Sequence, residues 1–309
     1  MTSPFGSLAV IVNPRAGRGR VAGQVPALER ALAANGLDFA LELTRAPGDA
    51  TRFAREAVRD GRRFLVAVGG DGTIQEVLNG MLDDGPAPPE QPVLGVVAAT
   101  SGCDLVRSFG LPEDTDGGCR HLAGTNTYPF DVIKIGYRDA SGERRTRYAA
   151  NLVEIGLGAA VARATARLPA RLGNAGRFLG FWSAYARSRT ASVKVDADMK
   201  TFEARAFNVI VANAQFTSAG LRMSPRSFPG DGVLDALVFC GPRSDAYRML
   251  PRIYRHGSHV PDPNIHEMRA KIRVAVEADR PLPIVADGEL LGTTPATFQV
   301  VPQRILLKL

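Results

Sequence analysis

The sequence has little cysteine, no long apolar run and no tract rich in lysine and arginine. Its three cysteines, Cys103, Cys119 and Cys240, are odd in number and lack CxxC spacing. This excludes a fully paired disulfide framework and predicts reduced thiols in a cytoplasmic protein. No window approaches about eighteen consecutive apolar residues, so we expect no transmembrane helix. The first residues have neither a basic start nor a long apolar core, so we expect no signal peptide.

The charge of the chain indicates an anionic partner. The formal net charge is +7 and the isoelectric point is about 9.7, values typical of a protein that binds a nucleotide or an anionic membrane. The basic residues are mostly arginines, and they are scattered along the 309 residues. Because they form no basic tract, we expect no nucleic acid among the partners.

The most informative segment is a glycine-rich loop that follows an apolar run. Residues 64–68 predict a strand buried on both faces, and the loop after them reads Gly69, Gly70, Asp71, Gly72 and Thr73. From Ile74 onward, apolar residues recur at helical spacing, so the loop lies between a strand end and a helix start. Glycines there let backbone amides approach a phosphate, and the helix start adds partial positive charge. We interpret the loop as a nucleotide loop that is neither a Walker A motif nor GxGxxG.

Asp71 is the only charged residue of this loop. Its carboxylate would repel a phosphate, so we assign it to Mg²⁺ or to hydrogen bonds with the loop and a nucleotide sugar. The alternative is an ordinary strand–turn–helix, in which the glycines supply turn geometry and Thr73 caps the helix.

Two different rhythms divide the chain. In the first part, predicted strands and helices alternate, with strands over 8–12, 39–43, 64–68 and 93–97 and helices over 21–34, 49–59 and 74–82. This alternation predicts an α/β domain with a doubly wound parallel sheet. After about residue 131 the chain is β-rich and predicts an antiparallel second domain. Its predicted strands are 128–137, 144–153, 192–195, 204–212, 233–239, 271–277 and 282–286, and its helices are 159–167, 177–187 and 245–254.

Two further loops follow strands of the predicted parallel sheet. The first strand is followed by Asn13, Pro14, Arg15, Ala16 and Gly17, and its arginine could pair with a phosphate. A loop with Thr100 and Ser101 follows the strand at 93–97. Because the carboxyl ends of parallel strands share one edge of a sheet, we expect these loops to meet the glycine-rich loop. The alternatives are a solvated basic turn and a helix N-cap.

Together these segments resemble the diacylglycerol kinase and sphingosine kinase catalytic-domain family, especially its small bacterial lipid kinases. The matching residues run in the family's order over essentially the whole chain: Asn13-Pro14 with Gly17, Gly69 to Thr73, Glu76 to Gly80, Leu94-Gly95, Asn151 with Gly156 and Gly158, Pro225, Asp231 to Asp235, and Asp287-Gly288-Glu289. The resemblance implies an NAD kinase-like α/β domain over 1–130 that binds ATP. It also implies an antiparallel β-sandwich over 131–294 that binds the lipid, with residues 295–309 returning to the first domain.

The resemblance also implies roles for individual residues. It places ATP against Asn13, Pro14, Arg15, Ala16, Gly17, Thr44, Gly69, Gly70, Asp71, Gly72, Thr73, Ser101 and Glu289. A structural Mg²⁺ would be held by Phe228, Asp231 and Val233, and Asp287 would accept the proton of the lipid hydroxyl while Asp71 organises the Mg²⁺-nucleotide. The alternative for Asp287-Gly288 is an ordinary β-turn.

One loop departs from the family pattern. The family usually reads Pro-x-Gly-Thr-x-Asn-Asp. In the places of its proline, glycine, threonine, asparagine and aspartate, this chain has Ala98, Thr100, Ser101, Cys103 and Asp104. Ceramide kinases also depart there, so the acceptor is either diacylglycerol-like or ceramide- and sphingoid-like. Two rival functions stay open, an NAD kinase-like enzyme and a catalytically weak lipid-binding regulatory protein.

A basic and aromatic segment lies in the predicted second domain. Residues 163–189 hold six arginines, no acidic residue, and Trp182 among several large apolar side chains. This mixture suits docking on an anionic bilayer. The alternative is a pair of helices that cover the sandwich. We expect a cytoplasmic protein, peripheral to the inner face of a membrane, and the sequence leaves a homodimer open.

Overall fold

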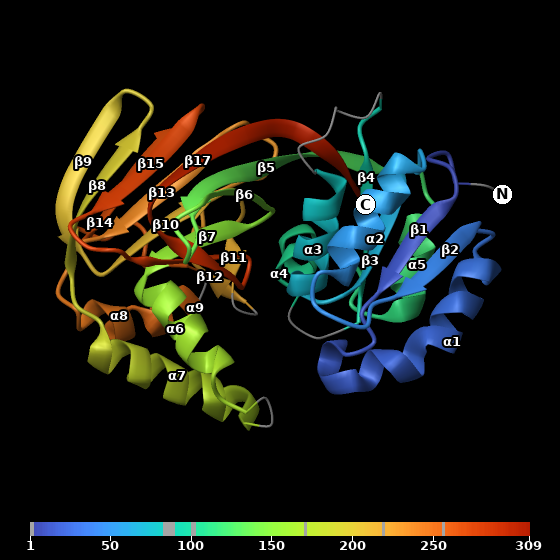
Figure 1. Cartoon of the computed structure of the whole chain (residues 1–309), viewed down its shortest axis with the longest axis horizontal. Helices are drawn as coiled ribbons and strands as arrows, with labels where there is room; N and C mark the ends of the chain where they lie inside the picture. The colour runs from blue at the N-terminus through green and yellow to red at the C-terminus, as the bar shows by residue number, and fades with distance from the viewer. Residues whose placement is uncertain (1–2, 83–89, 100–102, 170–171, 218–219, 255–256) are drawn as a thin grey trace. The chain divides into compact units, whose positions relative to one another are not determined.

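The computed structural model describes residues 3–82, 90–99, 103–169, 172–217, 220–254 and 257–309 (Figure 1). The chain divides into two compact units. Unit 1 comprises Met1–Val132, Ser218–Gly220 and Val301–Leu309, and unit 2 comprises Ile133–Thr217 and Leu221–Val300. Each unit has its own apolar core.

Unit 1 contains a parallel sheet, as the alternating pattern predicts. Its strands are β1 (Leu8–Val12), β2 (Phe39–Leu43), β3 (Phe64–Gly69), β4 (Val93–Ala98) and the end of β17 (Glu289–Lys308). They lie in the order β17-β4-β3-β1-β2, with parallel pairing throughout. The apolar runs β1, β3 and β4 are buried at every residue, whereas the edge strand β2 is not.

Helices cover the two faces of this sheet. On one face, Leu28 of α1 (Arg20–Ala34) and Leu122 of α5 (Thr115–Leu122) share a core with alternate strand residues such as Val66. The helices α2 (Asp49–Arg59) and α3 (Asp71–Met81) contact β1 and β3. A short 3-10 helix η1 (Ala16–Gly19) precedes α1, and α4 (Asp104–Phe109) precedes α5. Helix α3 begins three residues before the predicted start, because the residues after Gly70 already have helical backbone.

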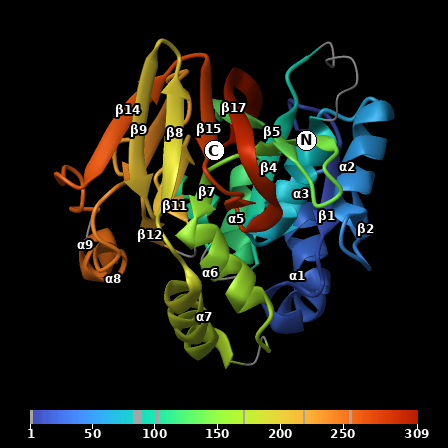
Figure 2. The same cartoon turned by 60° about the vertical axis from the view of Figure 1, so that its left-hand side comes forward.

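Unit 2 is antiparallel, which confirms the predicted class of the second domain. One path of strands runs β14-β13-β10-β7-β16-β17; β15 also pairs with β17 and β8, and β8 pairs with β9 (Figures 1 and 2). The strands are β5 (Thr127–Arg138), β6 (Arg144–Ala149), β7 (Leu152–Gly156), β8 (Ala191–Ala197), β9 (Lys200–Ala206), β10 (Asn208–Ala212), β11 (Phe216–Thr217), β12 (Leu221–Arg222), β13 (Leu234–Phe239), β14 (Ile265–Ala270), β15 (Arg273–Ala278) and β16 (Pro283–Ala286).

Two strands predicted as single runs are each two strands. Residues 144–153 form β6 and the start of β7, separated by Ala150 and Asn151, and residues 204–212 form the end of β9 and then β10. The backbone N–H groups of Ala150 and Asn151 bind a carboxylate, so the ladder is interrupted there.

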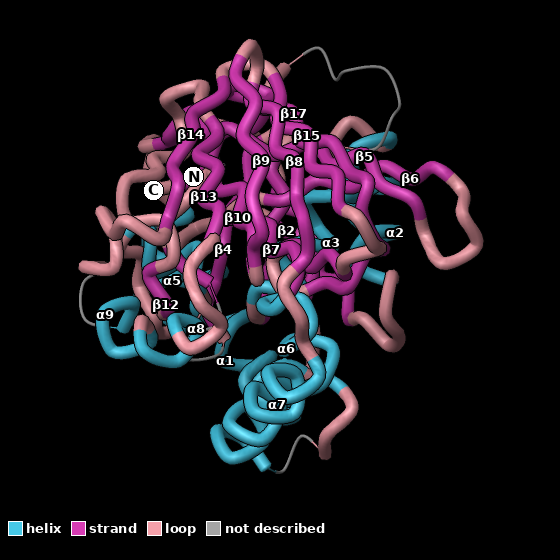
Figure 3. Tube along the Cα trace, turned by 90° about the vertical axis from the view of Figure 1, so that its left-hand side faces the viewer, coloured by secondary structure: helices cyan, strands magenta, loops and turns pink. Residues whose placement is uncertain are grey.

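Four helices gather at one end of the unit 2 strands (Figures 1 and 3). They are α6 (Leu157–Ala166), α7 (Gly173–Arg187), α8 (Asp245–Arg248) and α9 (Leu250–Tyr254). Across the described residues, we find no helix that has both the length and the apolar character needed to span a membrane.

Candidate functional site

The glycine-rich loop is a tight junction between β3 and α3. Gly70 is the N-cap residue of α3 and has no side chain that could cap the helix. A Cβ at Gly69 would overlap the Thr73 hydroxyl, so only glycine fits there. Thr73 does not cap the helix: its Oγ1 accepts a hydrogen bond from Asn13 Nδ2 at 3.2 Å. With no side-chain cap, the start of α3 is suited to an anion.

Asn13 joins the first loop to the glycine-rich loop. Its Oδ1 accepts from the Arg15 N–H at 3.0 Å, while its amide nitrogen reaches Thr73. Beyond it, Gly17 and Arg18 have φ values of 60° and 61°, a left-handed backbone that favours glycine. The two predicted loops therefore meet at the carboxyl edge of the sheet in unit 1.

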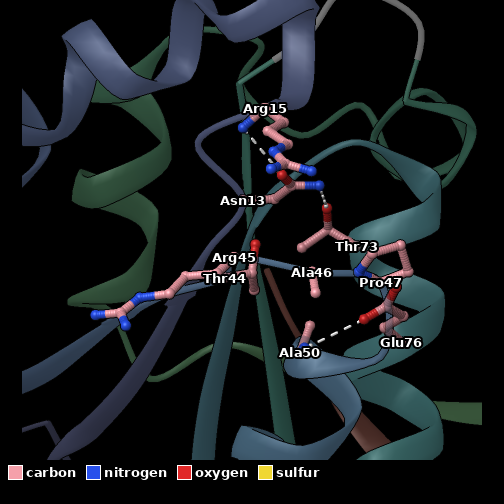
Figure 4. A pocket seen from close by; sticks show the side chains of 9 residues that line it. All are labelled: Asn13, Arg15, Thr44, Arg45, Ala46, Pro47, Ala50, Thr73 and Glu76. Atoms are coloured by element: carbon pink, nitrogen blue, oxygen red, sulfur yellow. Dashed lines mark hydrogen bonds between the residues drawn. The ribbon is translucent and has the colours of Figure 1, made fainter.

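A cavity of about 150 Å³ opens beside these loops (Figure 4). Four predicted site residues line it, namely Asn13, Arg15, Thr44 and Thr73, together with Arg45, Ala46, Pro47, Ala50 and Glu76. The motif reasoning did not assign the last five. Of these, only Glu76 had a signal in the sequence, because it belongs to the run that resembles the lipid kinases.

Glu76 shapes one wall of this cavity. Its Oε2 accepts from the backbone N–H groups of Gly48 at 3.1 Å and Ala50 at 3.2 Å, at the start of α2. Further along α3, a Cβ at Gly80 would overlap the backbone of Thr51. The residues Glu76 and Gly80 thus let α2 and α3 pack closely and fix the loop that lines the cavity.

Asp71 is held by the segment that follows β4. Its Oδ1 accepts from the Asp104 N–H at 2.9 Å and from the Cys103 thiol at 3.4 Å. Burial, together with the Asp71 charge, raises the pKa of Cys103, so the thiol stays protonated and can donate. The third loop thus keeps a donor to Asp71 despite its unusual sequence. Ser101, the other predicted residue of this loop, lies outside the described residues.

Asp287 and Glu289 lie in unit 2, at the turn between β16 and β17. The Asp287 carboxylate accepts from three backbone N–H groups: Ala150 at 2.6 Å, Asn151 at 3.1 Å and Leu152 at 3.0 Å. Its φ is 44°. Glu289 Oε1 accepts from Arg147 Nη2 at 2.6 Å, and Glu289 Oε2 makes no hydrogen bond with a described residue. Asp287 is therefore more than a turn residue, because it ties the turn to the β6–β7 junction.

The predicted structural metal turn is occupied by other interactions. Asp231 Oδ1 accepts from the Val233 N–H, and Oδ2 pairs with Arg269 Nη2, each at 3.0 Å. Arg269 Nε also binds Asp235, whose pKa is raised by burial. A guanidinium at this distance supplies the positive charge that a cation would bring and repels a second one. The residues present do not form a ready cation site, and we derive no step through a metal there.

Comparison with known families agrees with this arrangement. Residues 7–135 match the diacylglycerol kinase catalytic domain, and residues 151–308, more than half of the chain, match the YegS C-terminal NAD kinase beta sandwich-like domain. The chain belongs to the diacylglycerol kinase family. Membership of this family implies that the protein is a kinase, and the relatives of the chain support a lipid kinase.

Relatives named diacylglycerol kinase align with nearly the whole chain. The Bacillus subtilis (strain 168) protein is 25% identical over 296 residues, which is 94% of this chain and 91% of the relative. The Staphylococcus saprophyticus protein is 23% identical over 299 residues, which is 96% of this chain and 93% of the relative.

Solved structures share the fold of this diacylglycerol kinase family member. A Bacillus anthracis structure described as a diacylglycerol kinase has a TM-score of 0.71 and 20% identity, and covers 99% of this chain and 97% of that chain. Yeast NADH kinase complexed with NADH has a TM-score of 0.52 and 10% identity, and the match covers 97% of this chain and 82% of that chain. These likenesses confirm the NAD kinase-like fold class.

Proposed function

We propose that the chain transfers the γ-phosphoryl group of ATP to a primary hydroxyl of a membrane lipid, either diacylglycerol-like or ceramide- and sphingoid-like. The observation that carries the proposal is the junction of three loops in unit 1. Asn13 bridges the first loop to Thr73, and the segment after β4 holds Asp71 through the Asp104 N–H. The cavity beside this junction supports a nucleotide as the ligand.

The unit 1 site suits the phosphates by charge and by backbone. The uncapped start of α3 and the left-handed segment at Gly17 offer backbone N–H groups, and Arg15 lines the cavity. Phosphoryl transfer needs mainly positioning and stabilisation of negative charge. Asp71 would hold Mg²⁺ through its carboxylate, a ligand this cation prefers; bound there, Mg²⁺ would neutralise phosphate charge.

The hydroxyl proton needs an acceptor, and unit 2 offers two neighbouring carboxylates. Asp287 is the acceptor implied by the resemblance, but both its oxygens already accept backbone N–H groups. Glu289 was predicted to contact ATP, yet its Oε2 makes no hydrogen bond with any described residue. Either carboxylate could serve as a general base, and their variants distinguish them.

The test is phosphoryl transfer from [γ-³²P]ATP in the presence of Mg²⁺. The acceptors are diacylglycerol, ceramide, sphingosine and NAD, each offered separately, with Asp71→Asn as the control variant. We expect labelled lipid with one lipid class and none with NAD. Labelled NADP would support the NAD kinase-like alternative. ATP and lipid binding without transfer would support the regulatory alternative, and transfer unchanged in Asp71→Asn would contradict the assigned site.

A further inference from the structure

Helix α7 of unit 2 leaves three of its large apolar side chains exposed. Phe178 is 63% exposed, Leu179 50% and Trp182 41%. The small residues Gly180 and Ala184 are buried instead. A helix that merely covers a core shows the opposite arrangement, with its large apolar residues inside.

Close packing explains why the small residues face inward. Gly176, Gly180 and Ala184 are spaced four apart and form one stripe along the helix. A Cβ at Gly180 would overlap the hydroxyl of Thr165 on α6. Helix α7 therefore approaches α6 through its smallest residues, and the aromatic face lies on the other side of the helix.

The exposed residues belong to a larger aromatic surface. We define the α7 aromatic patch as Phe178, Leu179, Phe181, Trp182, Tyr185 and Tyr247. The ring centroids of Trp182 and Tyr247 are 5.9 Å apart, and those of Tyr185 and Tyr247 are 5.7 Å apart. Tyr247, on α8, is itself 40% exposed. The patch thus extends from α7 onto α8, and its aromatic rings pack against one another.

The exposed charged residues described on the two segments that carry the patch are all basic. Residues 155–195 contain no acidic residue, and Arg163 and Arg177 are exposed without an ion pair to any described residue. Arg243 lies over the Tyr185 ring, 4.8 Å from its centroid. The only acidic residue between 240 and 260, Asp245, is buried and accepts a hydrogen bond from Asn264 at 2.8 Å.

We propose that the α7 aromatic patch docks on the surface of an anionic phospholipid bilayer. Tryptophan and tyrosine favour the headgroup level, and each arginine near an anionic leaflet strengthens binding about fivefold. Helix α6 begins directly after β7, which pairs with β16, the strand that leads to Asp287. Docking would hold unit 2 at the source of the lipid. The inference rests on the proposed function, because a lipid kinase must meet its acceptor at a membrane.

The single tryptophan makes the inference directly testable. Trp182 is the only tryptophan of the chain, so its emission reports on the patch without a label. The probes are vesicles of phosphatidylcholine alone and vesicles with about 30 mol % phosphatidylglycerol. We expect a blue shift and saturable binding with the anionic vesicles, quenching by brominated acyl chains, and weaker binding as salt shortens the Debye length below about 8 Å.

Paired variants separate the apolar and the electrostatic contributions. Phe178→Ser with Leu179→Ser should lower vesicle affinity about tenfold, from the loss of buried apolar area. Arg177→Gln should lower it about fivefold. The matched controls are Met199→Ser, a side chain that is 98% exposed on the β8–β9 turn, and Arg144→Gln on β6. Both controls should bind like the wild type.

Three outcomes decide the matter. A vesicle affinity that changes neither with salt nor in the patch variants overturns the inference. A blue shift that grows with protein concentration without vesicles also overturns it, because a second copy would then cover the patch. Transfer to a short-chain, water-dispersed diacylglycerol tests the proposed function separately. If the wild type phosphorylates no lipid but binds anionic vesicles through the patch, docking stands and the proposed function fails.

Discussion

Replacing Asp287 by asparagine should destabilise unit 2, whatever its role in catalysis. Asparagine keeps the side-chain shape and tolerates the observed φ of 44°. It offers one oxygen and one NH₂ group, however, where three backbone N–H groups now share two carboxylate oxygens. At least one backbone N–H loses a charged acceptor, and the NH₂ group opposes it.

The expected magnitude follows from these contacts. A hydrogen bond to a charged group contributes about 1.5–3 kcal/mol. For a unit of this size, each kcal/mol shifts the melting temperature by about 2–4 °C, so we expect Tm to fall by about 3–12 °C. Glu289→Gln is the matched control, because its pair with Arg147 is about one-third exposed and contributes at most about 1 kcal/mol.

Thermal melting and single-lipid kinetics of the two variants give independent results. Turnover is measured well below the Tm of each variant and is expressed per folded molecule. Loss of the general base lowers kcat about 10²–10⁴-fold with little change in the KM for ATP. Such a loss in Asp287→Asn alone assigns the base to Asp287, and in Glu289→Gln alone to Glu289. A wild-type Tm for Asp287→Asn would refute the structural reasoning.

Three further predictions concern other residues. Asp71→Asn keeps an acceptor for the Asp104 N–H, so Tm should change little while kcat falls at least about 10²-fold; unchanged turnover would contradict the site. Burial lowers the pKa of His121 from 6.5 to about 4, so folding stability should fall as pH drops from about 6.5 to 4. The His121→Phe variant should lack this loss. An equal fall of Tm with pH in the variant and the wild type would refute the prediction. Chelation should leave Tm unchanged, because Arg269 already pairs with Asp231; a Tm that rises with added Mg²⁺ in Asp71→Asn but not in Asp231→Asn would show that a cation binds this turn.

The sequence predicts unit 1 closely because its signals are local. Strands over 8–12 and 39–43 and the helix over 49–59 coincide with β1, β2 and α2. Each is set by an apolar run or a helical period, bounded by glycine or a polar turn. The start of α3 was predicted three residues late, because amphipathic periodicity begins at Ile74 whereas the helical backbone begins directly after Gly70.

The contacts that build the candidate site are not local. Asn13 and Thr73 are 60 residues apart, and Asp287 binds an N–H group 137 residues away. Such pairs depend on strand order and register, which no short window encodes. The split of residues 144–153 into β6 and β7 has the same cause, since it depends on a carboxylate from a distant turn.

Helix α7 shows a different limit of sequence reasoning. The apolar residues of residues 177–187 have a helical period, but a period alone does not say which face meets the core. Residue size decides it here: Gly180 fits against Thr165 of α6 and Ala184 is buried, whereas Trp182 is 41% exposed. A stripe of small residues opposite a stripe of aromatic ones is therefore the signal to seek. It indicates a helix that packs by close approach and leaves its aromatic face for another surface.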